Sequence, residues 1–260
     1  IDSFKLLKII KANKQLCFTH EAGIIGLLLK KTTGTGYWLD YQGSLHKEMS
    51  KQHPIFSLFL PIRLFSFVEK KIEDEAEAVI YNSSESYANS AKTAKYLIED
   101  DSSVYDGYTE PQMKREKNIF NILWVGVMTP VQNIDEFVLL SERLLSKYDN
   151  LRITIAGFPV KQKYRDRLKS FSERAVFTGK VDYEKLPAMV MSSDLCVSTK
   201  GESSEGNAKL HLFKRFATKI IALRTKSSQE ILDSGSLADN LSELEIKIKE
   251  IIENANSASA

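Results

Sequence analysis

Apolar residues along this chain follow two alternating patterns, one typical of amphipathic helices and one typical of short buried strands. Near the start, Phe4, Leu7 and Ile10 share one face of a predicted helix, and the run "QLCFT" that follows predicts a strand. The same order then repeats up to residue 98. The pattern predicts helices over 22–32, 54–76 and 85–98 and strands over 36–43 and 78–83, with Pro54 and Pro61 bounding or kinking the long helix and Ser83 and Ser84 capping the last one.

The second half of the chain alternates more regularly. Nearly continuous apolar runs predict strands over 120–126, 151–157, 175–179 and 195–199, with helices between them over 134–148, 163–173 and 182–193. Apolar strands separated by helices are typical of a parallel sheet covered on both faces, so we expect a doubly wound α/β domain. Ligands of such sheets bind beyond the carboxyl ends of the strands, where the strand order reverses. The turns at 126–133, 157–160, 179–182 and 198–209 are therefore the places to look for a ligand.

Between the two halves the apolar periodicity disappears. Residues 99–118 carry turn chemistry at Asp106-Gly107 and at Pro111, and we place a domain boundary within them. At 260 residues the chain exceeds the usual size of one domain, so we expect two domains, 1–110 and 111–260.

Charge and composition narrow the class of protein. The 36 basic and 34 acidic side chains are spread along the chain, which gives no global field suited to nucleic acid. Cys17 and Cys196 lie in apolar runs, and neither they nor the histidines have metal-ligand spacing, so we expect a reduced compartment and no metal site. The apolar stretches are too short or too interrupted to span a bilayer, no signal peptide is visible, and Ile1 suggests that the natural start has been removed. These features predict a cytoplasmic protein.

One series of segments is more specific. "ILWVGVMTPVQNIDEFV", "LRITIAG", "TGKVDYEKLPAMVMSSDLCV", "EGNAKL" and "QEILDSG" follow one another, and in the third a glycine turn and a Tyr-x-x-Leu-Pro helix precede an Asp-led strand. In order and spacing this series, over residues 118–236, resembles the C-terminal domain of family 4 (group 1) glycosyltransferases of the GT-B type. The first half is a weaker match, through "FTHEAGIIG", "LDYQGSLHKE", "AVIYNSSESY" and "VYDGYTE".

The resemblance implies an enzyme with two Rossmann-like, doubly wound parallel-sheet domains. The C-terminal domain would hold a nucleotide diphosphate sugar, UDP-, GDP- or ADP-linked, and the N-terminal domain the acceptor. The N-terminal domain is expected to be truncated or reduced, because this chain begins at what corresponds to a helix midway through that domain. No cofactor is obligatory in such enzymes, whose catalysis is mainly positioning and charge stabilisation, with retention of configuration.

The resemblance also implies a donor site. A helix starting near Gly206 or Asn207 would direct unpaired N–H groups and the positive end of its dipole at the diphosphate. Lys209, in the first turn, would add a full charge, unless it is only an exposed surface lysine. Glu205 corresponds to the acidic residue directed at the donor sugar, and Gly126 would let the backbone approach the phosphates closely.

Four further residues complete the implied site. Backbone groups around Gly179 to Val181 would meet the base. His20, which we expect at the end of an apolar strand, corresponds to a histidine near the reacting sugar, and the alternative is a structural histidine with satisfied hydrogen bonds. Asp40 would orient an acceptor hydroxyl, although the residues around it favour a turn cap.

Several positions depart from the family pattern where the donor should bind. Similar proteins carry an arginine and a lysine where this chain has Val127 and Gln132, and a second glutamate where it has Phe213, eight residues after Glu205. Charge-assisted hydrogen bonds contribute about 1.5 to 3 kcal/mol each, so losing two cations would cost several kcal/mol if nothing replaced them. We therefore predict weak or altered donor binding rather than none. The candidate replacements are Lys200, Lys214 and Arg215.

Two function hypotheses remain. The first is a glycosyltransferase of polysaccharide biosynthesis that moves a hexose from a nucleotide diphosphate sugar to a carbohydrate or lipid-linked acceptor. The second is a degenerate glycosyltransferase domain that acts as a scaffold or partner of an active enzyme, since fold alone does not decide activity. A Rossmann oxidoreductase is set aside, because no Gly-x-Gly-x-x-Gly follows a strand. The aromatic stretch 56–67 is expected to be core helix, and the basic Arg63, Lys70 and Lys71 leave open a peripheral contact with the inner face of a membrane.

Overall fold

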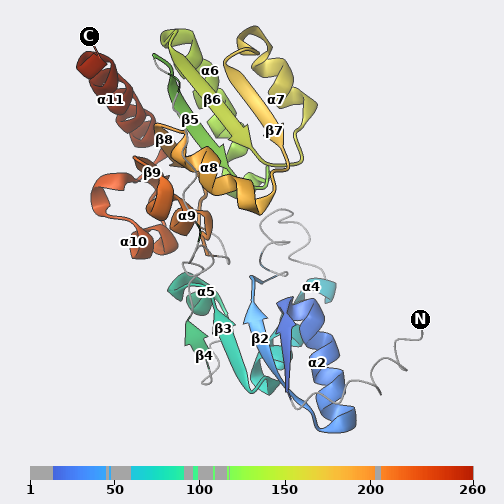
Figure 1. Ribbon diagram of the computed structural model, residues 1–260. Coiled ribbons are helices and arrows are strands. Elements are labelled where there is room, and N and C mark those ends of the chain that lie inside the picture. The colour runs from blue at the N-terminus through green and yellow to red at the C-terminus, as the bar shows by residue number, and fades with distance from the viewer. Residues whose placement is uncertain are drawn as a thin grey trace. The chain divides into compact units, whose positions relative to one another are not determined.

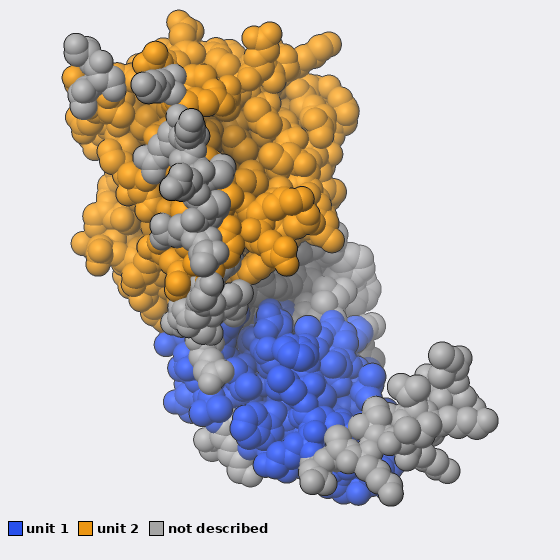
Figure 2. Space-filling model, in the orientation of Figure 1, with its two compact units in different colours: residues 1–101, 203–206 blue, residues 102–202, 207–260 orange. Residues whose placement is uncertain are grey.

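The computed structural model describes residues 14–44, 47, 60–90, 96–98, 108, 116, 118–202 and 206–259. The chain divides into two compact units (Figure 2): unit 1 comprises residues 1–101 and 203–206, and unit 2 comprises residues 102–202 and 207–260. Most of the expected boundary, 99–118, lies outside the described residues, and the division into domains 1–110 and 111–260 stays a prediction.

Unit 1 contains a parallel sheet whose strands lie in the order β1-β2-β3-β4, as in one half of a doubly wound sheet (Figure 1). Its elements are β1 (Lys14–Phe18), α2 (Thr19–Thr33), β2 (Gly36–Tyr41), α4 (Leu60–Glu75), β3 (Ala78–Tyr81), α5 (Ser84–Asn89) and β4 (Tyr96–Ile98). Helices α2 and α4 meet at Gly23, where a Cβ atom would lie only 2.5 Å from Cγ2 of Ile72. The core of the unit lies between these helices and the buried side chains of the strands, among them Cys17, Leu39 and Val79.

Two predictions for unit 1 are wrong. The helix expected over 85–98 ends at Asn89, and Tyr96–Ile98 form strand β4, which pairs with β3. The ring of Tyr96 stacks on Tyr87 at 4.0 Å between centroids, so tertiary pairing overrides the local helical pattern. His20 does not end a strand: β1 ends at Phe18, and His20 is the second residue of α2. The expected cap is confirmed at Ser83, whose side chain accepts a hydrogen bond from the backbone N–H of Ser86.

Unit 2 contains the predicted parallel sheet, which has six strands in the order β10-β9-β8-β5-β6-β7 (Figure 1). Its strands are β5 (Phe120–Val125), β6 (Leu151–Ala156), β7 (Ala175–Gly179), β8 (Leu195–Ser198), β9 (Ile220–Leu223) and β10 (Leu237–Ala238). Its helices are α6 (Ile134–Lys147), α7 (Gln162–Arg167), α8 (Leu186–Met191), α9 (Lys209–Phe216), α10 (Lys226–Ile231) and α11 (Leu241–Ser259).

Helices cover both faces of this sheet. Apolar side chains of α6, α7 and α11 form one core with Ile122 and Trp124 of β5, and those of α8, α9 and α10 form a second core with Leu123 and Val125 of the same strand. The chain runs outward from β5 through β6 to β7 and then returns to β8 on the other side of β5. The strand order therefore reverses between β5 and β8, and a ligand is expected beyond the carboxyl ends of these two strands.

Candidate functional site

Buried polar contacts join the loops that follow β5 and β8. The indole Nε1 of Trp124 donates a hydrogen bond to Oγ1 of Thr199 at 2.9 Å, and that hydroxyl donates to the backbone oxygen of Gln132 at 2.6 Å. Nδ2 of Asn133 donates to the backbone oxygen of Thr199 at 2.9 Å. These bonds hold the two loops together where the strand order reverses, and we call the region beyond the carboxyl ends of β5 and β8 the crevice.

Lys209, the first residue of α9, directs its side chain into this crevice. Its Nζ donates to Oε1 of Gln132 at 2.6 Å and to the backbone oxygen of Val125 at 2.9 Å, and lies 5.1 Å from the centroid of a Trp124 ring. The alternative of an exposed surface lysine is therefore wrong. The helix starts at Lys209, two to three residues later than the start expected near Gly206 or Asn207.

The electrostatics of this amine favour an anion. Burial lowers the pKa of Lys209 well below its ordinary value, and the positive charge of Lys200 lowers it further. Lys200 is buried, and within the described part of the chain no carboxylate pairs with Lys209. Of the three candidate replacement cations, Lys200 thus acts on Lys209, whereas Lys214 and Arg215 lie exposed in the last turn of α9.

Three glycines form the edge of the sheet beside this crevice. The backbone N–H of Gly126 donates to Ala156 at 3.0 Å, and that of Gly157 donates to Gly179 at 2.9 Å. A Cβ atom on Gly126 would lie 3.2 Å from Nζ of Lys209, and one on Gly157 would clash with the carbonyl oxygen of Gly126. Gly179 has a φ of +72°, which favours glycine. Side chains of Lys209, Trp124 and Gln132 lie within 3.3 Å of the Cβ position of Gly126, so glycine is needed there for their packing, and the expected approach of a ligand to this backbone stays a prediction. Val181 lies half-buried just beyond Gly179.

Two more of the expected residues, Gly206 and Asn207, lie just before α9. Asn207 is 4% exposed, its Nδ2 donates to Oγ of Ser198 at 3.4 Å, and its Oδ1 has no hydrogen-bond partner among the described residues. Gly206 belongs to unit 1, where a Cβ atom on it would lie 2.9 Å from Oδ1 of Asn82. Glu205 lies outside the described residues.

The expected acceptor-side residues lie in unit 1. His20 is buried, and its Nε2 lies 3.1 Å from Oε1 of Glu73 in α4. The hydroxyl of Tyr81 donates to the other oxygen of Glu73 at 3.4 Å. Asp40 is a half-buried residue of β2 whose Oδ1 accepts a hydrogen bond from Nε2 of Gln42 at 2.6 Å.

Phe213 belongs to the core rather than to the crevice. Its side chain is fully buried in the cluster formed with Leu123, Val125 and Cys196. The spacing of Leu210, Phe213 and Phe216 on one helix already indicates this inward face. The apolar residue at the position of the family's second glutamate therefore packs α9 onto the sheet.

Two residues at the crevice, Gln132 and Trp124, could not be found from the sequence. The sequence pattern does not indicate that Gln132 accepts a hydrogen bond from Lys209 or that Trp124 lies beside the amine. These residues are 77 and 85 positions away from Lys209, and only the fold brings them into contact with it. The sequence does indicate Lys200, because a basic residue directly after the strand over 195–199 stands at a carboxyl end, where ligands of such sheets bind.

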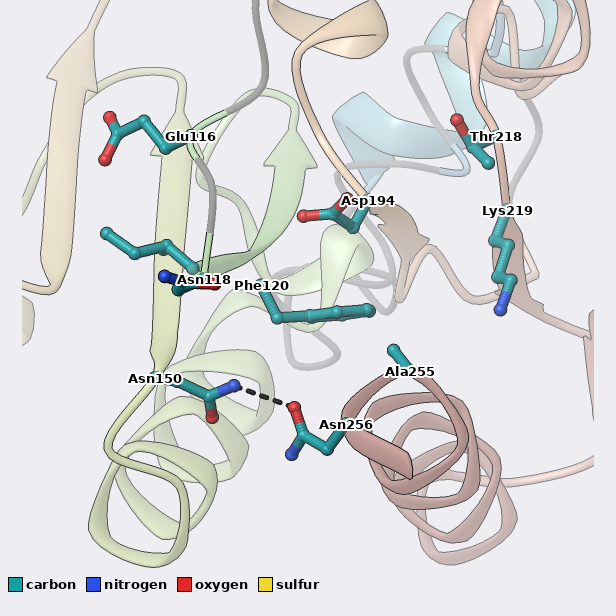
Figure 3. Close-up of a pocket in the computed structure, with 10 residues that line it drawn as sticks. Glu116, Asn118, Phe120, Asn150, Asp194, Thr218, Lys219, Ala255 and Asn256 are labelled. Carbon is teal, nitrogen blue, oxygen red and sulfur yellow. Dashed lines mark hydrogen bonds between the residues drawn. The ribbon is translucent and has the colours of Figure 1, made fainter. Parts of the chain in front are cut away.

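A pocket of about 650 Å³ lies at the opposite edge of the sheet (Figure 3). Its lining includes residues at the amino ends of β5, β6, β8 and β9, such as Phe120, Asp194 and Lys219. Nδ2 of Asn150 donates to Oδ1 of Asn256 at 2.7 Å across its rim, and a backbone N–H donates to Asp194 at 2.8 Å. Ligands of parallel sheets bind at the carboxyl ends, so we place the candidate site in the crevice and not in this pocket.

Two kinds of feature are absent from the described ranges. These ranges contain no group of three or more His, Cys, Asp or Glu side chains placed to hold a metal ion. None of their helices combines the length and the apolar character needed to cross a membrane.

A family model described as "Glycosyl transferases group 1" matches residues 119–254. A search of the curated proteins found no match. Among solved structures, sucrose-phosphate synthase from Thermosynechococcus elongatus is similar with a TM-score of 0.73 and 14% identity, over 99% of this chain and 68% of that chain.

Two other solved structures share the same arrangement. The Anabaena protein HepE, in complex with UDP and glucose, is similar with a TM-score of 0.72 and 14% identity, over 98% of this chain and 73% of that chain. A UDP-forming α,α-trehalose-phosphate synthase from Burkholderia xenovorans has a TM-score of 0.63 and 8% identity, over 95% of this chain and 68% of that chain. At such identities the likeness concerns the fold.

Proposed function

Because this chain belongs to the group 1 family of glycosyl transferases and has their GT-B fold, it is a sugar-transferring enzyme, and we propose that it moves a hexose from a nucleotide diphosphate sugar to a carbohydrate or lipid-linked acceptor. The alternative, a degenerate domain that serves as a scaffold or partner, has no specific observation in its favour.

The observation that carries the proposal is the buried amine of Lys209 beside Lys200 at the reversal of the strand order. Burial and a neighbouring positive charge both disfavour the ammonium form, and an anion bound there opposes both effects. A diphosphate supplies such an anion. Gln132 carries no charge, but its oxygen holds the Lys209 amine, so the helix supplies the cation that the loop after β5 lacks.

The remaining donor contacts follow from the same edge of the sheet. We expect the backbone at Gly126, beside Nζ of Lys209, to lie near a phosphate. The amide oxygen of Asn207, which has no partner among the described residues, can accept a hydrogen bond from a hydroxyl group of the donor. Gly206 precedes Asn207, and because it has no side chain the loop can pass close to Asn82. We expect backbone groups from Gly179 to Val181 to contact the base, which is uracil, guanine or adenine in UDP-, GDP- and ADP-linked donors respectively.

The chemistry of transfer matches this charge distribution. When the bond between the sugar and the diphosphate breaks, negative charge develops on the leaving phosphate, and positive groups already in place stabilise it without reorganisation. Lys209, Lys200 and the amino end of α9 supply that charge, so we expect no obligatory cofactor. Glu205 would face the donor sugar.

On the acceptor side we propose His20 as the residue near the reacting sugar and Asp40 as the group that orients the acceptor hydroxyl. Retention of configuration is the expected outcome. The hydrogen bond between His20 and Glu73 suits a structural role equally well. Measurements of unfolding and of turnover in variants distinguish the structural role from the catalytic one.

We propose a cytoplasmic enzyme of polysaccharide biosynthesis that contacts the inner face of a membrane peripherally. Helix α4 exposes Leu64, Phe65 and Phe67 near Lys70, a combination that suits an interfacial contact.

Release of nucleoside diphosphate tests this function. The purified chain is incubated with UDP-, GDP- and ADP-linked hexoses, with and without a mixture of oligosaccharide acceptors, and the free nucleoside diphosphate is measured over time. The proposal predicts steady release from one donor, faster with an acceptor. Binding of a nucleotide without release from any donor would favour the scaffold alternative.

A further inference from the structure

Exposed apolar side chains gather along the carboxyl edge of the unit 2 sheet. Val127, Phe158 and Tyr183 follow β5, β6 and β7 respectively, and each is exposed. Elsewhere in the described part of unit 2, large apolar side chains are exposed only at Val176 and Ile246. Three exposed apolar side chains that follow successive strands at one edge are candidates for contact with a ligand.

The backbone of Phe158 is held in place although its ring is not packed in either core. Its carbonyl oxygen accepts a hydrogen bond from the backbone N–H of Met128 at 2.9 Å. The preceding residue, Gly157, donates to Gly179 and lies so close to the carbonyl oxygen of Gly126 that no side chain fits there. The ring, 46% exposed, is therefore presented to solvent by a fixed loop.

The surroundings of this ring suit a flat partner that carries hydrogen-bonding groups at its edge. Nζ of Lys180 lies 5.8 Å from the ring centroid. Gly179 has no atom within 4 Å of the place where a Cβ would stand, so the space above the end of β7 is open. Backbone groups of 179–181 remain beside it to contact the edge of a ring.

Phe158 also lies on the side of the proposed phosphate site toward which the nucleoside would extend. Gly126 lies against Nζ of Lys209 on one side and against Gly157 on the other. A diphosphate at Lys209 thus continues along the edge, past Gly126, toward Phe158. This is the direction in which the nucleoside of a donor must extend if its phosphates occupy the crevice.

We propose that Phe158 is the platform on which the nucleobase of the donor stacks. The inference rests on the proposed function, and adds to it a residue that binds the base through its ring face. Stacking on an aromatic ring tolerates every base, because each base has a π-face. Phe158 therefore supplies affinity for the base, and the backbone of 179–181 reads its edge.

Calorimetric titration of the full chain with UDP, GDP and ADP, and with pyrophosphate as a probe without a base, tests this proposal. Phe158→Ala is expected to weaken binding of the preferred nucleoside diphosphate by about 10- to 100-fold and to leave pyrophosphate binding unchanged. Phe158→Tyr keeps the ring and is expected to keep the affinity. Ile246→Ala, an exposed apolar residue of α11, is the matched control and is expected to bind as the unaltered chain does.

Three results would overturn the inference. Unchanged nucleotide affinity in Phe158→Ala removes the platform and leaves the proposed function intact. An equal loss for pyrophosphate shows that the variant disturbs the phosphate site instead. Absence of nucleotide binding by the unaltered chain removes both the platform and the proposed function.

Discussion

The amine of Lys209 lies 2.6 Å from the side-chain oxygen of Gln132 and 2.9 Å from the backbone oxygen of Val125. A lysine ammonium has three N–H donors, and these two neutral acceptors use two of them. The third is left for a ligand at the point where the strand order reverses. A buried ammonium with one donor to spare and Lys200 nearby binds a phosphate oxygen well, because the phosphate supplies the missing negative charge.

Proton uptake should accompany nucleotide binding. The lowered pKa of Lys209 means that above this pKa the free protein holds a neutral amine, and the diphosphate favours the ammonium. Affinity is therefore expected to fall as the pH rises through the lowered pKa. Titrations at one pH in two buffers of different ionisation enthalpy measure the protons taken up. Identical heats in both buffers, or the same uptake in Lys209→Ala, would contradict this assignment.

The contact between Gly157 and Gly126 predicts a sharp stability effect. Gly157→Ala places a methyl group against the carbonyl oxygen of Gly126, and backbone cannot move aside as a flexible side chain can. We expect a loss of several kcal/mol in the free energy of unfolding, measured in urea. Gly235→Ala is the control, because no atom lies within 4 Å of its Cβ position. Equal stability of the two variants would show that the edge of the sheet is looser than described.

Restoring the family's acidic residue at position 213 should damage the protein rather than improve the site. Phe213 is fully buried in an apolar cluster, so Phe213→Glu buries a carboxyl group without a partner. We expect destabilisation of more than about 4 kcal/mol, against about 1 kcal/mol for Phe213→Leu. Denaturant unfolding of both variants measures the difference. A stable Phe213→Glu with tighter nucleotide binding would mean that this side chain faces the donor after all.

The buried pair of His20 and Glu73 gives a prediction for unit 1. His20→Ala removes this partner of the Glu73 carboxyl group, and losing one partner of a buried hydrogen bond costs about 1 to 3 kcal/mol. Lys31→Ala, an exposed change in the same helix, is expected to alter stability by less than about 0.5 kcal/mol. Turnover per folded molecule separates the roles: it falls in His20→Ala if the imidazole acts near the reacting sugar and stays unchanged if the histidine is structural.

The fold could be predicted where a single segment carries its own pattern. The mainly apolar runs of β5 and β8 are buried on both faces of the sheet, and a parallel sheet covered by helices accommodates such strands. Strand β4 could not be predicted in this way, because Tyr96, Leu97 and Ile98 continue the helical spacing of the segment before them. Their strand conformation depends on pairing with β3.

The candidate site could be predicted in its place but not in its contacts. The turn before α9 follows from the strand pattern, and its lysine follows from the resemblance. The partners of these side chains do not: Gln132 is 77 residues from Lys209, and Glu73 is 53 residues from His20. Contacts across such separations depend on the strand order, which the hydrophobic pattern of one sequence leaves open.

Calorimetric titration with UDP, GDP and ADP, with and without magnesium, tests the central claim most directly, in the unaltered chain and in Lys209→Ala and Lys214→Ala. Lys214 is an exposed lysine of the same helix and serves as the control. We predict micromolar binding of one nucleotide, weaker by about 1 to 3 kcal/mol in Lys209→Ala and unchanged in Lys214→Ala. No heat from any of the three nucleotides, or an unchanged dissociation constant in Lys209→Ala, would contradict the account.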